Sequence, residues 1–225
     1  NLGNIIISAL TVDSHDFYKS IESLSSILNL KGRVLPSTTE NVCLKATMSD
    51  GSVITGESQI RDSELDIVSV FYDKPVKTYN KVIQAIKKAD YIIVGIGSLF
   101  TSILPNLIID DIKQALYLCK GKDNYYCNSM TVKGETTDYT VEDHVNAIEK
   151  HIGKKTIDAV VLSNDCIPQY ILDRYDAEGS KEVILRDTKH DYQVFSFNLL
   201  SFANDLVRHD PDKVRDSFIE VTRRI

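Results

Sequence analysis

The stretch YIIVGIGSLFTSILPNL, from Tyr91 to Leu107, combines a short apolar run with two glycines, a group of hydroxyl side chains and a proline. The apolar run ends at Gly95, which is typical of a buried strand that stops in a tight turn. Ser98 can act as the N-cap of a turn that leads from the strand into helical structure, and Pro105 fits the first turn of the helix expected over residues 105–120. The stretch therefore predicts a strand–turn–helix unit of an α/β protein.

The same rhythm continues along the chain after residue 78. Helical spacing alternates with short apolar runs, and apolar strands between helices favour a mostly parallel sheet covered on both faces, which is a three-layer α/β fold. The expected helices cover residues 79–90, 105–120, 140–153 and 168–176, and the expected strands cover 91–95, 124–128 and 158–164.

Both ends of the chain have helical patterns. Residues 4–10 and 15–29 predict two helices, the second with a buried face. That face consists of Phe17, Ile21, Leu24, Ile27 and Leu28. At the other end, residues 197–225 predict two helices that are separated at Asp210-Pro211, because proline disfavours helical geometry just before it.

Residues 32–72 predict a small β-rich hairpin insertion. Short β-rich runs occur at 32–38, 41–48, 52–58 and 66–72. Asp50-Gly51 lies between two of these runs and is a hairpin signal. We expect residues 1–225 to form a single α/β domain, and the absence of an initiating Met suggests that the natural protein has a further N-terminal segment.

Composition narrows the class of protein. Lys and Arg number 26 against 32 Asp and Glu, so the net charge is -6, which disfavours a nucleic-acid-binding protein. No apolar run reaches the roughly 20 residues that span a membrane, and we expect a cytoplasmic protein. Four widely spaced cysteines predict buried, reduced thiols. They are Cys43, Cys119, Cys127 and Cys166.

Three loops follow the expected strands, where ligands bind in parallel α/β sheets. The first holds Gly95, Gly97 and Ser98 with Thr101 and Ser102. Its glycines and hydroxyls suit an anion, although a plain strand-to-helix turn explains them equally well. The third loop is residues 163–165.

The second loop, residues 128–136, is long enough to fold over a ligand. Asn128 can donate to and accept from a base or a sugar hydroxyl. Glu135 is open to three interpretations, namely a base, a ribose ligand or a solvated acid. The loop also contains Thr131 and Thr136.

Several other polar groups have a functional and a structural interpretation. Arg208-His209-Asp210 offers a phosphate-binding guanidinium or a helix C-terminus with favourable cations. His144 and His151 share a helix face without a third metal ligand, which favours solvated polarity over a metal site. Asp110-Asp111 fits the first turn of a helix better than a metal pair. We expect no metal and no catalytic residue.

Six segments together resemble the bacterial gluconeogenesis factor family, in the 2-phospho-L-lactate transferase-like superfamily. They are LGN (2–4), KGRVLPST (31–38), DGSVITGES (50–58), GIGSLFTSILPNL (95–107), CNSMTVKGETTDYTVEDHV (127–145) and VRHDPDKV (207–214). The resemblance implies a modified Rossmann-like fold. It also implies a cytoplasmic bacterial protein that supports growth and cell shape (morphogenesis) on gluconeogenic carbon sources.

The resemblance further implies that the ligand is a UDP-sugar, UDP-N-acetylglucosamine above all, with no certain cofactor and no established catalysis. Carried onto this chain, it places Gly95, Gly97, Ser98, Thr101, Ser102 and Asn106 along the cleft. Residues 128–136 would cover the cleft, and Arg208 would meet the diphosphate or the sugar.

The chain also departs from the family pattern. The family's glycine-rich N-terminal segment is absent, and Pro211 stands where some relatives have a phosphorylatable Thr. We therefore expect a binding or regulatory protein. A 2-phospho-L-lactate transferase-like phosphotransfer enzyme is the alternative, and an interaction scaffold is a third reading. A homodimer is left open, and no sequence feature names a protein partner.

Overall fold

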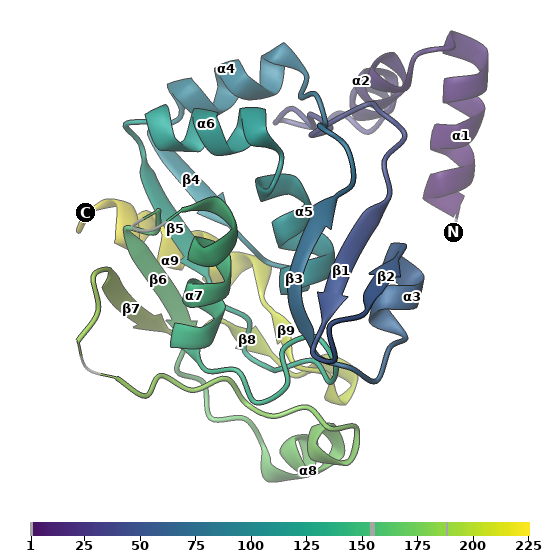
Figure 1. Ribbon diagram of the computed structural model, residues 1–225. Helices are drawn as coiled ribbons and strands as arrows, with labels where there is room; N and C mark the ends of the chain where they lie inside the picture. The colour runs from purple at the N-terminus through teal and green to yellow at the C-terminus, as the bar shows by residue number, and fades with distance from the viewer. Residues whose placement is uncertain (1, 154–155, 188) are drawn as a thin grey trace.

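The computed structural model describes residues 2–153, 156–187 and 189–225. Its main sheet has four parallel strands among the described residues, in the order β4–β5–β6–β7 (Figure 1). Their bounds are Tyr91–Val94, Lys122–Tyr126, Ala159–Ser163 and Gln193–Phe197. The register places Val160 opposite Tyr125 on one side and Val194 on the other. The predicted parallel sheet is confirmed, and β7 is a strand that the sequence reasoning missed.

Helices cover both faces of this sheet, which confirms the three-layer α/β fold (Figure 1). Because side chains alternate along a strand, Tyr125 and Val160 pack toward α7, whereas Tyr126 and Val161 pack toward α8 and α9. The helices of the main body are α4 Asn80–Lys88, η1 Leu99–Ile103, α5 Leu104–Leu107, α6 Asp110–Leu118, α7 Val141–Ile152, α8 Gln169–Ala177 and α9 Pro211–Thr222.

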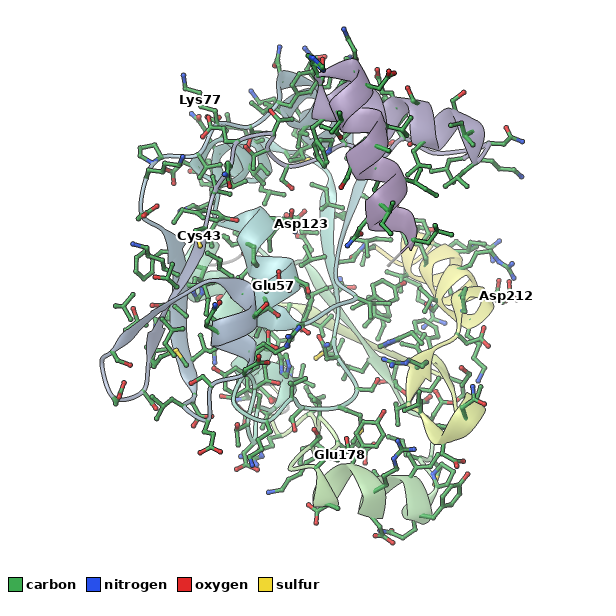
Figure 2. The ribbon with its side chains drawn as sticks, turned by 90° about the vertical axis from the view of Figure 1, so that its right-hand side faces the viewer. Cys43, Glu57, Lys77, Asp123, Glu178 and Asp212 are labelled. Carbon is green, nitrogen blue, oxygen red and sulfur yellow. The ribbon has the colours of Figure 1, made fainter. Side chains whose placement is uncertain are left out.

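A second, antiparallel sheet of order β2–β1–β3 lies beside the main body. Its strands are β1 Leu44–Met48, β2 Val53–Thr55 and β3 Ile67–Tyr72, and the short helix α3 Glu57–Arg61 follows β2. Gly51, with φ +85°, makes the turn between β1 and β2, so the predicted hairpin is confirmed. In Figure 2, Cys43 beside this sheet and Asp212 on α9 lie on opposite sides of the molecule.

Three further sequence predictions are wrong. Residues 32–38 form no strand, because this segment crosses the surface and Ser37 Oγ donates to Asn106 Oδ1. The helical stretch after β4 begins at Leu99, with Ser98 at its N-cap position, so it starts before Pro105, where the helix was expected. Cys43 and Cys166 are exposed, whereas Cys127 is buried. The prediction of a buried thiol is therefore wrong for Cys43 and Cys166 and confirmed for Cys127.

The N-terminal helices α1 Leu2–Ser14 and α2 Phe17–Ile27 form a pair at one side of the molecule (Figure 1). The predicted buried face of α2 is wrong, because Phe17, Ile27 and Leu28 are exposed. The helix contacts the body through Tyr18 instead, whose ring stacks on Tyr79 with centroids 4.4 Å apart. An aromatic stack therefore replaces the expected aliphatic stripe.

The C-terminal region contains one helix where two were predicted. Residues 199–209 form a hairpin of β8 Leu200–Ser201 and β9 Arg208–His209, joined through the short η2 Ala203–Asp205. Asn204 and Asp205 both have positive φ, which ends any helix there. The second helix, α9, is confirmed, with Asp210 accepting at its N-terminus from the backbone of Asp212 and Lys213.

Of the two histidines on α7, His144 is buried and His151 is half-buried, so the prediction that both are solvated is wrong. His144 is 0% exposed. His151 Nδ1 lies 2.6 Å from Ala147 O, so Nδ1 carries the proton, and Nε2 accepts from Val70 N at 3.1 Å. This bond ties β3 of the small sheet to α7 of the main body, and burial lowers the pKa of His151.

Replacing His151 with Ala leaves the Val70 N–H without its acceptor. We expect the free energy of unfolding to fall by about 1–3 kcal/mol, measured by urea titration at pH 8. An exposed-site control, His15→Asn, keeps a residue that tolerates positive φ and should leave stability unchanged.

The same bond requires a neutral imidazole, so stability should depend on pH. Because the folded-state pKa of His151 lies below its ordinary value of 6.5, the unfolded chain binds more protons as pH falls through that value. Stability is therefore fully present above pH 6.5 and declines below it. The decline should be shallower in His151→Ala than in the wild type, and equal slopes would contradict this assignment.

Candidate functional site

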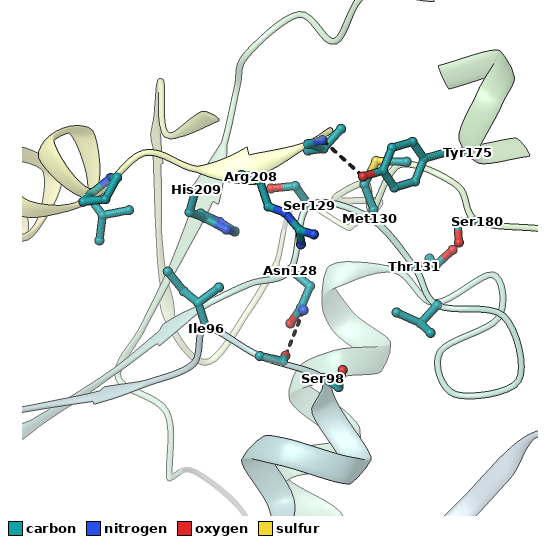
Figure 3. A pocket seen from close by; sticks show the side chains of 15 residues that line it. Ile96, Ser98, Asn128, Ser129, Met130, Thr131, Tyr175, Ser180, Arg208 and His209 are labelled. Atoms are coloured by element: carbon teal, nitrogen blue, oxygen red, sulfur yellow. Dashed lines mark hydrogen bonds between the residues drawn. The ribbon is translucent and has the colours of Figure 1, made fainter. Parts of the chain in front are cut away.

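A cavity of about 630 Å³ opens where β4 and β5 end, beneath the β8–β9 hairpin (Figure 3). Its volume lies in the range of small-molecule sites, and its place at the carboxyl ends of parallel strands is where such folds bind ligands. Its lining residues are Ile96, Gly97, Ser98, Asn128, Ser129, Met130, Thr131, Val132, Tyr175, Ser180, Val207, Arg208, His209, Pro211 and Val214.

Gly95 makes the turn that leads from β4 into the cavity wall. It has φ +109°, and a Cβ placed on it would lie 2.7 Å from the backbone oxygen of Tyr126. No other residue type fits both the conformation and the space. The loop after β4 therefore packs directly against β5, and its residues Gly97 and Ser98 line the cavity.

Asn128 joins the two loops that form the floor of the cavity. Its Nδ2 donates to the backbone oxygen of Gly97 at 2.9 Å, and its Oδ1 accepts from Tyr125 Oη at 3.4 Å. These bonds fix the amide orientation and leave one Nδ2 proton for a ligand. Asn128 thus acts as a positioning group for the first loop as well as a lining residue.

Glu135 occupies the start of the helix that follows the first loop. Its side chain is buried, and Oε1 accepts from Phe100 N at 2.7 Å, Thr101 N at 3.0 Å and Thr101 Oγ1 at 3.3 Å. Burial raises the pKa of Glu135, and these hydrogen bonds oppose the shift. Of the three interpretations left open by the sequence, a solvated acid is wrong.

The carboxylate of Glu135 therefore holds the position where a helix N-terminus would otherwise attract an anion. The helix itself opens as a π-helix, in which Ile103 N donates to Ser98 O at 3.0 Å. The wider π-turn is common at functional sites. An anionic ligand in the cavity would consequently meet Ser98 and the opposite wall rather than the first turn of η1.

The opposite wall is the β8–β9 hairpin, which carries Arg208 and His209 (Figure 3). The prediction that Arg208-His209 ends a helix is wrong, because both residues pair with β8. Asp165, directly after β6, anchors the hairpin, and its Oδ2 accepts from Leu199 N at 2.6 Å and Leu200 N at 2.8 Å.

His209 brings an unpaired polar atom to the cavity. Its Nε2 is buried and has no hydrogen-bond partner within the described structure. Burial lowers the pKa of His209, and the charge of Asp165 opposes that shift. A neutral imidazole can donate to or accept from a ligand at this atom.

The structure brings together part of the predicted site. Gly97, Ser98, Asn128, Thr131 and Arg208 line the cavity. Gly95 supports it through the backbone, as described above. The ligand-binding role of each of these residues stays a prediction.

The other predicted residues point elsewhere. Thr136 Oγ1 accepts from Val132 N at 2.9 Å, and Thr101 bonds to Glu135, so both hydroxyls serve the loop itself. Asn106 Nδ2 donates to the backbone oxygen of Ser102 at 2.8 Å, and neither residue lines this cavity.

Sequence reasoning missed several lining residues. His209 could have been predicted, because it stands next to Arg208 in the Arg208-His209-Asp210 triplet and the sequence placed Arg208 in the site. Tyr175, Met130 and Val207 carried no signal, because they reach the cavity only through the folding of α8 and the hairpin. Between residues 2 and 225, the described part of the chain contains no group of three side chains able to hold a metal.

Comparison with known proteins places this geometry in a family. The family model described as 2-phospho-L-lactate transferase CofD matches residues 1–200, and the chain belongs to that family. Its relatives include the gluconeogenesis factor of Bacillus subtilis, 36% identical over 99% of this chain and 72% of the relative. The gluconeogenesis factor of Halalkalibacterium halodurans is 34% identical over 98% of this chain and 70% of its own length.

A solved structure supports the same relationship. A crystal structure of a protein of the UPF0052 family from Bacillus halodurans matches with a TM-score of 0.92 and 34% identity, over 96% of this chain and 72% of that one. The resemblance to gluconeogenesis factors is thereby confirmed at the level of the family. The described helices include none that is long and apolar enough to cross a membrane.

Replacing Gly95 with Ala should destabilise the fold strongly, because the new Cβ meets the Tyr126 oxygen. Gly153→Ala is the matched control, since Gly153 has φ +117° with nothing within 4 Å of its Cβ position. Both variants strain the backbone, at about 1–3 kcal/mol. We expect Gly95→Ala to cost about 2 kcal/mol more in urea unfolding, and equal losses would show that the close contact relaxes.

Glu135→Ala should leave the buried N–H of Phe100 unpaired and free the loop of residues 128–136. We expect a loss of about 3 kcal/mol in the free energy of unfolding. Glu135→Gln should lose about half as much, because its amide oxygen still accepts. The exposed Glu178→Ala serves as the control. A loss in Glu135→Ala no greater than in the control would refute the role of this carboxylate.

Proposed function

We propose that this chain is a nucleotide-sugar-binding regulatory protein of the UDP-N-acetylglucosamine class, without catalytic turnover. The proposal extends to a cytoplasmic role in growth and cell shape on gluconeogenic carbon sources, as the resemblance implies. It rests on one observation above all, the distribution of charge around the cavity.

The charge of the cavity differs from that of the whole chain. The net charge is -6, yet the described lining residues contain Arg208 and His209 and no Asp or Glu. A guanidinium and a serine hydroxyl in the lining of one cavity are suited to phosphate oxygens. A phosphate-bearing ligand is therefore favoured over a neutral or cationic one.

The remaining lining suits a nucleoside. Tyr175, Met130 and Val207 provide apolar area beside the hydroxyl groups of Thr131 and Ser180. Tyr175 is held in place because its Oη accepts from Val207 N at 3.1 Å. Apolar walls with a few fixed polar groups are the usual surroundings of a bound base and ribose.

A second candidate is phosphotransfer of the 2-phospho-L-lactate transferase kind, which the name of the matching family model favours. Fold alone does not fix function. Incubating the chain with the nucleotide-linked phospholactyl donor, the deazaflavin acceptor and Mg²⁺ separates the two, and formation of the joined product would establish the enzyme instead.

Arg208→Ala should weaken binding of UDP-N-acetylglucosamine at least tenfold in isothermal titration calorimetry. The reason is that a charge-assisted hydrogen bond to phosphate contributes about 1.5–3 kcal/mol, and 1.4 kcal/mol corresponds to a factor of ten. The control is Arg215→Ala, on α9, whose guanidinium is paired with Asp212 and Asp216. Absence of binding to the wild type would overturn the proposal.

A further inference from the structure

A second cavity of about 250 Å³ adjoins the first at the carboxyl ends of β5, β6 and β7. The two cavities share Asn128 and Ser129 in their linings. Further lining residues of the second cavity are Cys127, Val141, Leu162, Ser163, Ile167, Glu182, Val183, Ile184, Leu185, Ser196 and Leu200. The two cavities are therefore neighbours, with Asn128 and Ser129 at the boundary between them.

The second cavity is roofed by a segment that is bonded to the loop after β5. Lys181 O accepts from Thr131 N at 2.7 Å, and Val183 N donates to Ser129 O at 3.0 Å. Ile184 O accepts from Val141 N at the start of α7 at 3.1 Å. The segment that roofs the cavity is thus held by backbone hydrogen bonds to the loop after β5 and to the start of α7.

An unpaired hydroxyl marks the junction of the two cavities. Ser129 Oγ is buried and has no hydrogen-bond partner within the described structure. A buried hydroxyl without a partner is costly, and a ligand atom at the junction would satisfy it. Ser129 is thus a natural contact for the atoms that link the two parts of a ligand.

The two cavities differ in chemistry. The first has Arg208 and His209 in its lining, whereas the described lining of the second has no Lys, Arg or His and has Glu182 as its charged residue. Serine hydroxyls and aliphatic side chains make up most of the rest. An uncharged group with hydroxyl substituents fits these surroundings, and a second anionic group does not.

We infer that the second cavity is the subsite for the uncharged sugar at the end of the diphosphate, and that it rejects sugars that carry a carboxylate. This inference rests on the proposed function. The volume provides space for about eight waters at roughly 30 Å³ each, which is room for a single sugar ring.

Ser196 offers a way to close this subsite without touching the first cavity. It lies on β7 opposite Leu162, lines only the second of the two cavities and is exposed at the surface of the strand. Ser196→Leu places a larger side chain in the space, and Ser196→Ala keeps it open as the matched control. Thermal unfolding of both variants checks that the fold is retained.

The experiment is calorimetry of the wild type and both variants with UDP, UDP-glucose and UDP-glucuronate. The last two ligands differ by a carboxylate in place of a hydroxymethyl group. We expect the wild type to bind UDP-glucose at least fivefold more tightly than UDP and than UDP-glucuronate. Ser196→Leu should abolish the gain over UDP while leaving UDP itself within twofold, and Ser196→Ala should retain the gain.

Three outcomes would overturn the inference while leaving nucleotide binding intact. They are equal affinities of the wild type for UDP and UDP-glucose, equal affinities for the neutral and acidic sugars, and a loss of UDP binding in Ser196→Leu as large as that of UDP-glucose. If the wild type binds none of the three ligands, the proposed function itself fails, and the inference falls with it.

Discussion

The hydrogen bonds between the Glu135 carboxylate and the first turn of the helix after β4 hold together the end of the molecule that contains the cavity. One buried oxygen accepts from Phe100 N, Thr101 N and Thr101 Oγ1. The loop that follows β5 is thereby fixed to the helix that follows β4. Because the Glu135 carboxylate already balances the partial positive charge of the helix N-terminus, no bound anion is needed there.

The cavity is consequently assembled from separate pieces, each with its own attachment. Asn128 ties the first two loops to one another through the Gly97 oxygen. Asp165 ties the hairpin to the end of β6 through the amides of Leu199 and Leu200. Among the described lining residues of the cavity, Arg208 on the hairpin carries the positive charge. The charge of the cavity therefore comes from a different element than the loops after β4 and β5 that shape its floor.

The sequence predicted the parts of the fold that depend on local patterns. Asp50-Gly51 located a hairpin, and the apolar run ending at Gly95 located a buried strand, because both signals lie within a few residues. It did not predict that Glu135 bonds to Thr101, 34 residues away. Nor did it predict the strand at Arg208, since residues 199–209 have helical spacing and the positive φ angles at Asn204 and Asp205 turn the chain back.

The attachment of the hairpin has a consequence for how proteins of this family can diverge. The hairpin that carries Arg208 and His209 is short and follows the last strand of the main sheet. It is secured by the Asp165 carboxylate, by the bond from Val207 N to Tyr175 Oη and by the burial of Leu199 and Leu200. Arg208 itself is exposed, so its substitution changes the charge at the cavity without altering this buried packing. The charge of the cavity can therefore diverge at exposed positions of the hairpin, while its buried positions stay constrained by stability.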